Sequence, residues 1–272
     1  MENEHFIPLN SSILTIKPFN KFDDKLIVGF STRNNGVSKK PYESLNLGLH
    51  VQDDEQKVIL NREKVAEDLK ISLEKWVFAE QVHSNKIKKI SQKDCGSGTL
   101  DIASVIKGAD GLYTKEANVL LASLYADCVP LYFYSPSNAL IGLAHAGWKG
   151  TVGKIGTNMV HMWTEVEKVS LDSIYVAIGP SISQESYEVD DYVIDEVNKV
   201  IVDEYQLPYI KVNTNQYLLD LKLLNKQLLL ATGIKEEQIF VSNYCTYKNS
   251  KTFFSYRRNQ QTGRMMSYIG RK

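Results

Sequence analysis

Unbroken runs of apolar residues are the most regular feature of this chain. Most are short and rich in β-branched and aromatic residues, a pattern that indicates β-strands. The runs near the middle of the chain do not alternate with polar residues, so we expect several strands that are buried on both faces. The runs occupy residues 26–31, 76–82, 119–134, 140–144, 173–178, 238–247 and 252–256.

Three other segments place apolar residues three and four positions apart, which predicts amphipathic helices. They cover residues 55–70, 151–168 and 220–233, and Gly233 is a typical helix stop. Because strands and helices are interspersed, we expect an α+β or mixed α/β fold built in layers. No repeat, low-complexity segment or Pro/Ser-rich linker divides the chain, so we expect residues 1–272 to form one domain.

Composition and charge exclude several classes of protein. Lysine plus arginine and aspartate plus glutamate number 32 each, so no net charge favours nucleic acid or an anionic membrane surface. No apolar run approaches the roughly 20 residues of a membrane helix, and acidic residues stand where a signal peptide carries basic ones. Three cysteines are too few for a disulfide framework. We therefore expect a soluble, cytoplasmic protein with no nucleic-acid or membrane partner.

Three residues with metal-binding side chains stand in distinctive stretches: His83 in FAEQVHSN, Cys128 in LYADCVP and His145 in GLAHAGWKG. Zn²⁺ prefers imidazole and thiolate ligands, and a set of three leaves the fourth tetrahedral position open for water, phosphate or substrate. The separations of 45 and 17 residues match no zinc finger. Position is more informative, because His145 ends an apolar run just before a glycine-rich entry into a predicted helix. Neighbouring strands could bring Cys128 beside it.

Each of these residues also has an ordinary structural explanation. Cys128 alone could be a buried core cysteine, and either histidine could be a satisfied structural residue. Asp127 argues against a purely apolar environment, because a charge next to a buried run needs a partner. The weaker candidates are His161, expected on the solvated face of its helix, His5, near a frayed terminus, Cys245, expected in the core, and His50, which could line a site without being a ligand.

Phosphate or another anion would need cationic and amide donors near the metal. Guanidinium groups suit bidentate recognition of oxyanions, although any single arginine could be a surface charge. Asp127 could orient a ligand or act as an acid or base. The expected anion-binding residues are Arg33, Asn46, Lys149, Arg257 and Arg258.

Two further motifs do not predict separate sites. GWKGTVGKI resembles a nucleotide P-loop, but five residues separate Gly147 from Gly153, and Ile155 stands where Ser or Thr would bind Mg²⁺. The acidic residues within 188–191 are more typical of a helix start, where carboxylates meet the positive end of the helix dipole, than of a catalytic pair.

A series of short motifs follows in order between residues 30 and 265: QVHS, ADCVP, AHAGWKGT, AIGPSI, SYEV, CTY, FFSYRR and TGRM. Together they resemble the laccase-domain family of cytoplasmic proteins. Its members were first labelled multicopper polyphenol oxidases and are now regarded as purine nucleoside phosphorylases with adenosine deaminase activity. The resemblance implies a single αββα-type layered domain with mixed β-sheets, and a zinc ion held by His83, Cys128 and His145. It also implies phosphorolysis of adenosine, inosine and 5′-methylthioadenosine, and deamination of adenosine.

The chain departs from the family pattern at three positions. Lys149 replaces an arginine, Ser84 replaces a glycine, and Ser181 stands where GPC is common. The implied metal ligands are intact, so these departures concern substrate preference more than the metal site. In phosphorolysis, the metal and the basic side chains at positions 33, 149, 257 and 258 would be available to neutralise phosphate.

Three other functions stay open. Copper-dependent phenol oxidation would need about ten histidines, whereas the chain has five; copper could still replace zinc, because the affinity order favours it. Cys128 and His145 could instead form the thiolate–imidazolium dyad of a metal-free hydrolase or deamidase, which leaves His83 without a role. A binding module with a structural zinc would need a fourth protein ligand, for which neither Cys95 nor Cys245 has an obvious claim.

Overall fold

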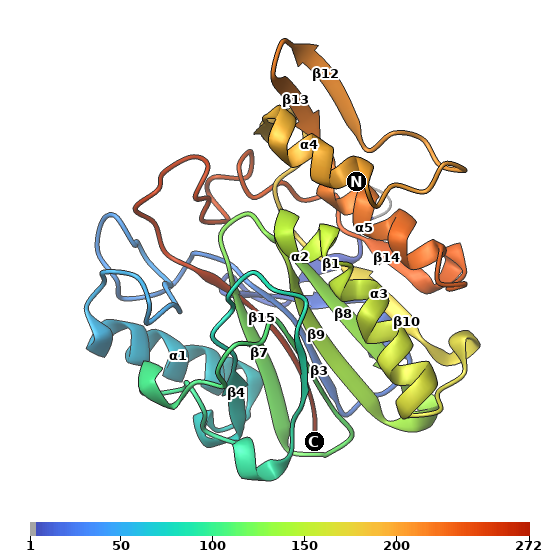
Figure 1. The fold of residues 1–272 in the computed structure, drawn as a ribbon. Coiled ribbons are helices and arrows are strands. Elements are labelled where there is room, and N and C mark those ends of the chain that lie inside the picture. The colour runs from blue at the N-terminus through green and yellow to red at the C-terminus, as the bar shows by residue number, and fades with distance from the viewer. Residues whose placement is uncertain (1–3) are drawn as a thin grey trace.

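Two six-stranded mixed β-sheets pack face to face at the centre of the molecule (Figure 1). They belong to a computed structural model that describes residues 4–272. In spatial order, the first sheet consists of β1 (Phe6–Pro8), β2 (Ile13–Ile16), β3 (Leu26–Ser31), β15 (Met265–Arg271), β7 (Val119–Tyr125) and β4 (Trp76–Phe78). The second consists of β14 (Ile239–Val241), β10 (Tyr175–Ile178), β8 (Val129–Ser135), β9 (Leu140–Ala146), β6 (Gly111–Thr114) and β5 (Ile87–Lys89).

Alternation of side chains along the central strands explains why their apolar runs have no polar side. In β7, Leu121 and Tyr125 enter the core between the two sheets. Leu120 and Leu124 point the other way and join the cluster under α1 (Glu55–Leu69). β8 and β9 likewise divide their side chains between the inter-sheet core and the helices behind the second sheet. The predicted burial on both faces is confirmed for these strands.

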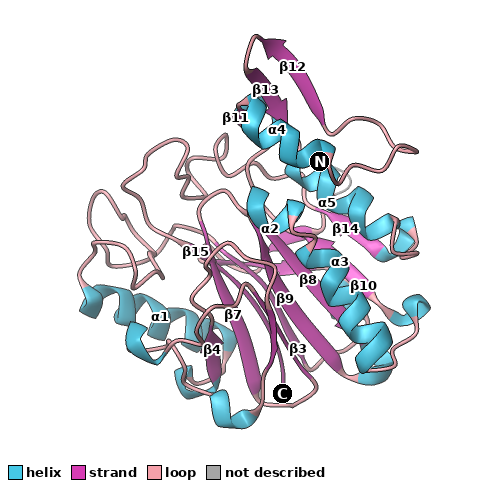
Figure 2. Cartoon of the chain, in the orientation of Figure 1, coloured by secondary structure: helices cyan, strands magenta, loops and turns pink. Residues whose placement is uncertain are grey.

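Helices cover the outer face of each sheet, which gives a four-layer αββα arrangement (Figure 2). α1 covers the first sheet. The second is covered by α2 (Trp148–Val152), α3 (Ile155–His161), a π-helical turn (Met162–Val166) and α5 (Leu221–Leu230). The predicted fold class is therefore confirmed. The helix predicted at 151–168 is divided, because Lys154 adopts a positive φ of 59°; its apolar stripe is still buried, mainly through Ile155, Met159 and Trp163.

The predicted strand bounds differ from the structure where the chain leaves a sheet. The run at 119–134 is two strands, joined by residues 126–128, which cross from the first sheet to the second. The strands predicted at 76–82 and 238–247 end at Phe78 and Val241. The strand at 252–256 is wrong: this segment forms a loop, and it is apolar because Phe253 and Phe254 fill the inter-sheet core. β15 was not predicted, since serine and glycine interrupt its apolar pattern.

A small three-stranded sheet projects from one end of the layers (Figures 1 and 2). It contains β11 (Glu188–Val189), β13 (Gln216–Leu219) and β12 (Tyr209–Asn213). α4 (Asp191–Asn198) follows β11, and the Asp190 side chain accepts a hydrogen bond from the Val193 backbone N–H at 3.1 Å. The predicted helix start is confirmed for Asp190 and Asp191, whereas Glu188 lies in β11. Within residues 4–272, no helix combines the length and hydrophobicity needed to cross a membrane.

Glu167 ties the end of the helical layer to the second sheet. Its carboxylate lies 2.7 Å from the ammonium groups of Lys89 and Lys115, and Tyr113 donates a hydrogen bond to it at 3.1 Å. The two lysines, Lys115 first, lower the pKa of Glu167 to about 2. Because this pKa lies below the ordinary value of 4.5, the associated stability is present above about pH 4.5 and is lost as the pH falls towards about 2.

Replacing Leu121 tests the core between the sheets. Leu121→Ala should lower the free energy of unfolding by about 2–5 kcal/mol, because it removes a fully buried side chain and leaves a cavity. Leu60→Ala, on the exposed side of α1, should change it by less than about 0.5 kcal/mol. Urea denaturation followed by circular dichroism measures both, and equal losses would contradict the assigned core.

Replacing Glu167 tests the charge cluster. Glu167→Gln should lower the free energy of unfolding at pH 7 by about 1–2 kcal/mol, a figure reduced for the solvent around the two lysines. The difference in free energy of unfolding between the wild type and the variant should be about 1 kcal/mol smaller at pH 3.5 than at pH 7. At pH 3.5 the wild-type carboxylate is largely protonated in the unfolded chain, so folding gains less from its ionisation. Denaturant unfolding at the two pH values measures this. The control is Glu204→Gln, at an exposed position; a gap that widened in acid would have the wrong sign.

Candidate metal centre and its cavity

The three predicted metal ligands lie where the chain crosses between the two sheets. The link between β4 and β5 carries His83, and the link between β7 and β8 carries Cys128. His145 lies near the end of β9, in the same row of side chains as Ile141 and Leu143, which face the inter-sheet core. Its ring therefore points between the sheets, beside both crossovers. As predicted, β8 and β9 are neighbours and bring Cys128 and His145 together.

The side chains of the three residues meet. Their ligand atoms all lie within 4.8 Å of one another, and the imidazole rings of His83 and His145 lie 4.9 Å apart at 82°. Gly147 provides the necessary space, since a Cβ there would lie 3.1 Å from Cys128 Sγ and 3.2 Å from His83 Cδ2. Two imidazoles and one thiolate at this spacing fit a divalent transition-metal ion, with small side-chain adjustments bringing each atom to about 2.0–2.3 Å from it. The trio is therefore a candidate metal site.

A buried carboxylate that the sequence did not reveal holds this arrangement together. Asp110 Oδ1 lies 3.0 Å from His145 Nδ1, which leaves Nε2 of the ring for a metal. The same carboxylate accepts hydrogen bonds from the backbone N–H groups of Val82, His83 and Ser84 at 3.2, 3.0 and 2.7 Å. The Ser84 hydroxyl donates a further bond at 2.8 Å. Asp110 thus fixes both the ring of one candidate ligand and the loop that carries another.

Charges around the trio favour a thiolate. Burial alone would raise the pKa of the Cys128 thiol, but His145 and His83 outweigh it and lower this pKa to about 6. Burial would lower the pKa of His145, but Cys128 and Asp110 instead raise it to about 9. Both shifts favour a thiolate at Cys128 beside an imidazolium at His145. Thiolate is the form of cysteine that binds metals, and a bound cation would take the place of the imidazolium proton.

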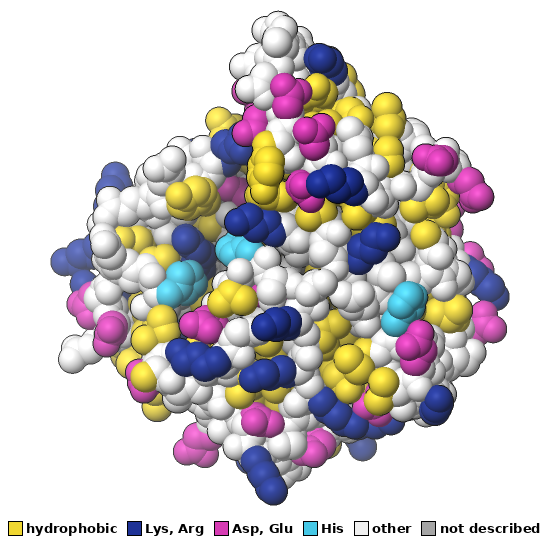
Figure 3. All heavy atoms as spheres, viewed as in Figure 1, with side chains coloured by type: hydrophobic (Ala, Val, Ile, Leu, Met, Phe, Trp, Pro, Cys, Tyr) yellow, Lys and Arg dark blue, Asp and Glu magenta, His cyan; other side chains and the backbone are white. Residues whose placement is uncertain are grey.

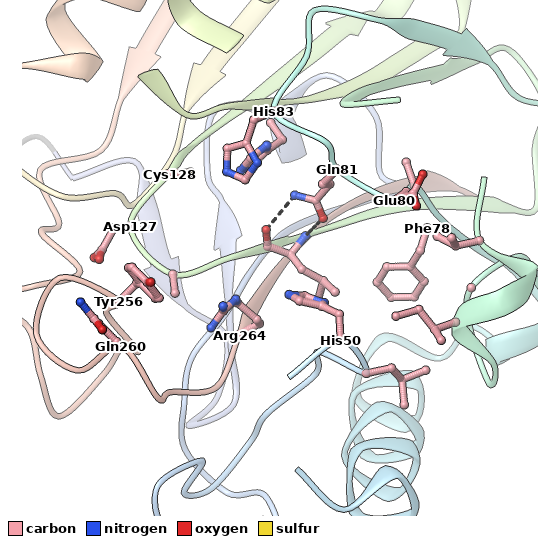
Figure 4. Close-up of a pocket in the computed structure, with 18 of the residues that line it drawn as sticks. His50, Phe78, Glu80, Gln81, His83, Asp127, Cys128, Tyr256, Gln260 and Arg264 are labelled. Atoms are coloured by element: carbon pink, nitrogen blue, oxygen red, sulfur yellow. Dashed lines mark hydrogen bonds between the residues drawn. The ribbon is translucent and has the colours of Figure 1, made fainter. Parts of the chain in front are cut away.

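The trio forms part of the wall of a cavity of about 1000 Å³ (Figure 4). Phe78, Val105 and Leu124 line an apolar part of this cavity. A second cavity of about 360 Å³ adjoins it, and Trp148 and Tyr187 face both. Figure 3 shows histidine side chains beside a hollow on this face of the molecule. The larger cavity has the size of sites that enclose small organic ligands, roughly 300–1,000 Å³.

Residues with positive φ cluster beside the cavity. Gln81, His83 and Asp127 have φ values of 54°, 58° and 98°, which are costly for residues other than glycine. The side-chain amide of Gln81 donates a hydrogen bond to the Leu124 carbonyl and accepts one from the Leu124 N–H, each at 2.8 Å (Figure 4). These are the two backbone groups that a neighbouring strand would bond. These bonds attach the crossover loop to β7 and help to hold His83 in place.

Asp127 lies next to Cys128 in the cavity wall, but its carboxylate is engaged. Thr246 donates a hydrogen bond to Oδ1 at 2.6 Å. Ser255 Oγ and the Arg257 backbone N–H donate to Oδ2 at 3.0 and 2.7 Å. Asp127 therefore anchors the loop that contains these donors to the β7–β8 crossover. Both oxygens of this carboxylate accept hydrogen bonds, which favours the anchoring role. Its role as an acid or base stays a prediction.

Two of the predicted anion-binding residues face the cavities. Arg257 lines the larger one; its guanidinium lies 5.1 Å from the centre of the Tyr187 ring and donates to the Glu188 carbonyl at 2.9 Å. Lys149 lines the smaller one, in the first turn of α2, with its ammonium 5.6 Å from the Trp148 ring. Both cations are near the trio, as expected.

The other three line neither cavity. Arg33 donates to the carbonyls of Glu43 and Ser250, and its guanidinium stacks on Phe254 at 4.6 Å. Arg258 donates to backbone carbonyls in the loop of residues 246–253. Asn46 is fully buried and bonds to Gly48 and to the Arg264 N–H. Their contact with phosphate stays a prediction, and their bonds favour structural roles.

Other sequence predictions have mixed outcomes. His161 is exposed, Cys245 is buried and His50 lines the larger cavity, as expected. His5 is packed rather than frayed, since its ring lies 5.4 Å from that of Phe240. The residues that the sequence analysis missed are Asp110, Gln81, Arg62 and Arg264. Asp110 carries the signal that singled out Asp127, a lone acid beside an apolar run, and Arg264 lies within the TGRM motif, but Arg62 is one more charge on a helix.

Comparison with known proteins places the chain in a family. The family model for multi-copper polyphenol oxidoreductase laccase matches residues 27–272. The chain belongs to this family. The predicted resemblance to laccase-domain proteins is thereby confirmed over almost the entire sequence. The family's description mentions copper, but the donor set of the trio does not by itself distinguish copper from zinc.

Relatives in this laccase family match the chain along its length. Purine nucleoside phosphorylase YlmD of Bacillus subtilis is 49% identical over 254 residues, which cover 93% of this chain and 91% of that protein. YlmD of Geobacillus stearothermophilus is 48% identical over 247 residues, 90% of each chain. The crystal structure of the Geobacillus protein has a TM-score of 0.96 over 99% of both chains, at 44% identity. A hypothetical protein YfiH from Bacillus licheniformis has a TM-score of 0.95 over 98% of this chain and 99% of that one, at 45% identity.

Replacing Asp110 tests its hold on the trio. Asp110→Asn should weaken metal binding by about 10- to 100-fold, because the amide holds the His145 ring and the His83 loop less firmly. Competition with a chelator, together with the metal content per chain, measures this. The control is Asp172→Asn, which alters an exposed carboxylate paired with Lys235. Unchanged metal affinity in the Asp110 variant would contradict the positioning role.

Proposed function

We propose that this protein is a zinc-dependent purine nucleoside phosphorylase that also deaminates adenosine. The observation that carries the proposal is the open His83–Cys128–His145 cluster in the wall of a cavity large enough for a nucleoside. Three protein ligands leave a coordination position free, as in catalytic rather than structural zinc sites. The names of the YlmD relatives, nearly half identical to this chain, support the phosphorylase activity.

The walls of the larger cavity suit a nucleoside. Phe78 and Val105 offer apolar surface, and Trp148 and Tyr187 offer aromatic faces near the trio. A purine is flat and can stack on such surfaces, while the ribose hydroxyls need polar neighbours such as Gln260. The walls support a nucleoside in general, and the resemblance to laccase-domain proteins implies adenosine, inosine and 5′-methylthioadenosine as the substrates, with inorganic phosphate as co-substrate.

In phosphorolysis the bond from the anomeric carbon to the base nitrogen breaks, and a bond from that carbon to a phosphate oxygen forms. The base leaves with the bonding electron pair and takes up a proton. Lys149 and Arg257 line the two cavities that contain the trio and would neutralise phosphate there, and Trp148 and Tyr187 line both cavities. A zinc ion at the trio would supply a Lewis acid. In deamination, in the same cavity, the oxygen of water bonds to C6 of adenine, the bond from C6 to the amino nitrogen breaks, and ammonia leaves with a proton from the water.

The remaining expectations follow from this function. We propose that residues 1–272 work as one domain and that the protein acts in the cytoplasm, where a reducing environment keeps Cys128 as a free thiol or metal ligand. Copper-dependent phenol oxidation is less well supported. The described residues offer one cluster of this kind, and the chain has five histidines, too few for several copper centres.

A metal-free Cys–His hydrolase is the second candidate, and a specific observation favours it. Asp110, His145 and Cys128 lie in the order of a catalytic triad, with a 3.0 Å contact between carboxylate and imidazole and a lowered pKa at the thiol. This alternative gives His83 no chemical task, although His83 lies within reach of both partners. The two candidates therefore differ at His83.

The His83→Ala variant separates the two functions. We expect it to lose bound metal and to lose nucleoside turnover by about 100-fold or more, because two ligands hold a metal poorly. His161→Ala, on the exposed side of α3, should retain both. Metal analysis and chromatography of products from adenosine, with and without phosphate, measure the outcome. Ribose-1-phosphate formed only with phosphate supports phosphorolysis, and inosine supports deamination; full activity in metal-free His83→Ala would favour the hydrolase.

A further inference from the structure

The side of the larger cavity that faces α1 is lined by basic side chains without acidic partners. These side chains are His50, Arg62 and Arg264. Within residues 4–272, no carboxylate forms an ion pair with either arginine, and their side-chain hydrogen bonds go to backbone carbonyls. A buried cation without a counter-charge is costly to maintain, so its presence in a cavity wall indicates an anionic ligand.

Arg62 is the most deeply buried of the three, with 1% of its surface exposed. Its guanidinium stacks on Phe78 at 4.2 Å and donates to the carbonyls of Leu47, Gly98 and Thr99. Burial lowers the pKa of Arg62 to about 9, so the group is still charged at neutral pH. The carbonyls fix the position of this guanidinium in the cavity wall without neutralising its charge.

Arg264 and His50 lie side by side in the wall of the cavity that Arg62 also lines (Figure 4). Gly48 packs against both: a Cβ there would be 2.8 Å from Arg264 Cγ and 3.3 Å from His50 Cε1. Arg264 uses Nη1 to reach the carbonyls of Thr262 and Gly263, which leaves Nε and Nη2 for a ligand. Burial, Arg264 and Arg62 lower the pKa of His50 to about 4, as a region of positive potential would. Neutral His50 can still donate one N–H.

We propose that His50, Arg62 and Arg264 form a binding subsite for a phosphate group. Arg264 supplies the free N–H donors, and such guanidinium donors bind phosphate oxygens through strong charge-assisted hydrogen bonds. Arg62 contributes positive charge, since its donors go to carbonyls. Burial lowers the pKa of Arg264, and the charges of Cys128 and Asp127 oppose this shift. Arg264 also lines the same cavity as the trio, so the subsite and the trio belong to one site. The assignment rests on the proposed function: in a phosphorylase this anion is inorganic phosphate, and Arg257 lines the same cavity.

Two of the arginines expected to bind phosphate are engaged elsewhere. Arg33 and Arg258 use their donors on backbone carbonyls outside the cavity. Arg264 keeps two donor groups free within it. Two sources of the phosphate group remain chemically equivalent at this point, free inorganic phosphate and the 5′-phosphate of a nucleotide. The experiment must separate them.

The test is a calorimetric titration of metal-loaded protein with inorganic phosphate and, separately, with adenosine 5′-monophosphate. Arg264→Gln should weaken binding of the true ligand by about tenfold or more, and Arg264→Lys by less, because one charge-assisted donor remains. Lys107→Gln is the matched control. It removes one positive charge from the exposed rim of the same cavity, where Lys107 faces Glu80 at 3.8 Å, and should change affinity by less than about twofold. Metal content and circular dichroism verify each variant.

The outcomes separate this subsite from the proposed function. Phosphate binding that depends on Arg264, in a protein that converts no nucleoside, would support the subsite and contradict the function. Nucleoside turnover with an unchanged KM for phosphate in Arg264→Gln would support the function and overturn the subsite. Binding of the nucleotide alone would assign the subsite to a phosphate ester. Equal losses in Arg264→Gln and Lys107→Gln, or no binding of either ligand by the wild type, would overturn the proposal.

Discussion

The carboxylate of Asp110 is the interaction on which the candidate site depends. A buried carboxylate is stable only when its oxygens are well hydrogen-bonded, and Asp110 meets this need with three successive backbone N–H groups, one hydroxyl and one imidazole. The N–H groups belong to the crossover from the first sheet, while the imidazole projects from β9 of the second. This one side chain therefore connects the two sheets and helps to fix the distances between the candidate ligands.

The two-sheet architecture supplies the rigidity that this arrangement needs. Each central strand is buried on both faces, so a displacement of β7 or β9 would disturb packing throughout the layers. The crossovers leave these strands at the same end of the inter-sheet core, where the core gives way to the cavity. Positive φ values at Gln81, His83 and Asp127 are tolerated there because hydrogen bonds to Leu124, Asp110 and Thr246 hold each residue. The crossover loops carry two of the candidate ligands, and the central strands hold these loops in place.

The sequence predicted the parts of this site that depend on local pattern. Apolar runs located β7, β8 and β9, and the residues at their ends included Cys128 and His145. His83 needed the family resemblance, because it lies in a loop beyond a three-residue strand. The sequence did not identify Asp110 and Arg264 as site residues, because their roles depend on partners distant in the sequence and on backbone atoms. Arg33 and Arg258 were expected to bind phosphate, but their side chains donate to backbone carbonyls. Such bonds cannot be predicted from the pattern of residue types.

The loop that follows β14 joins two adjacent arginines with opposite tasks. Arg257 extends over Tyr187 into the cavity, while Arg258 turns back and binds carbonyls of its own loop. Asp127 sets this register by accepting the backbone N–H of Arg257. Deletion of one residue before this point would move Arg258 to the cavity position and leave Asn259 at the position that binds the loop carbonyls. Insertion of one residue would move Arg257 to the loop position and put Tyr256 at the cavity position. The length of this segment is therefore under tighter constraint than its composition, and substitutions are easier to accommodate here than indels.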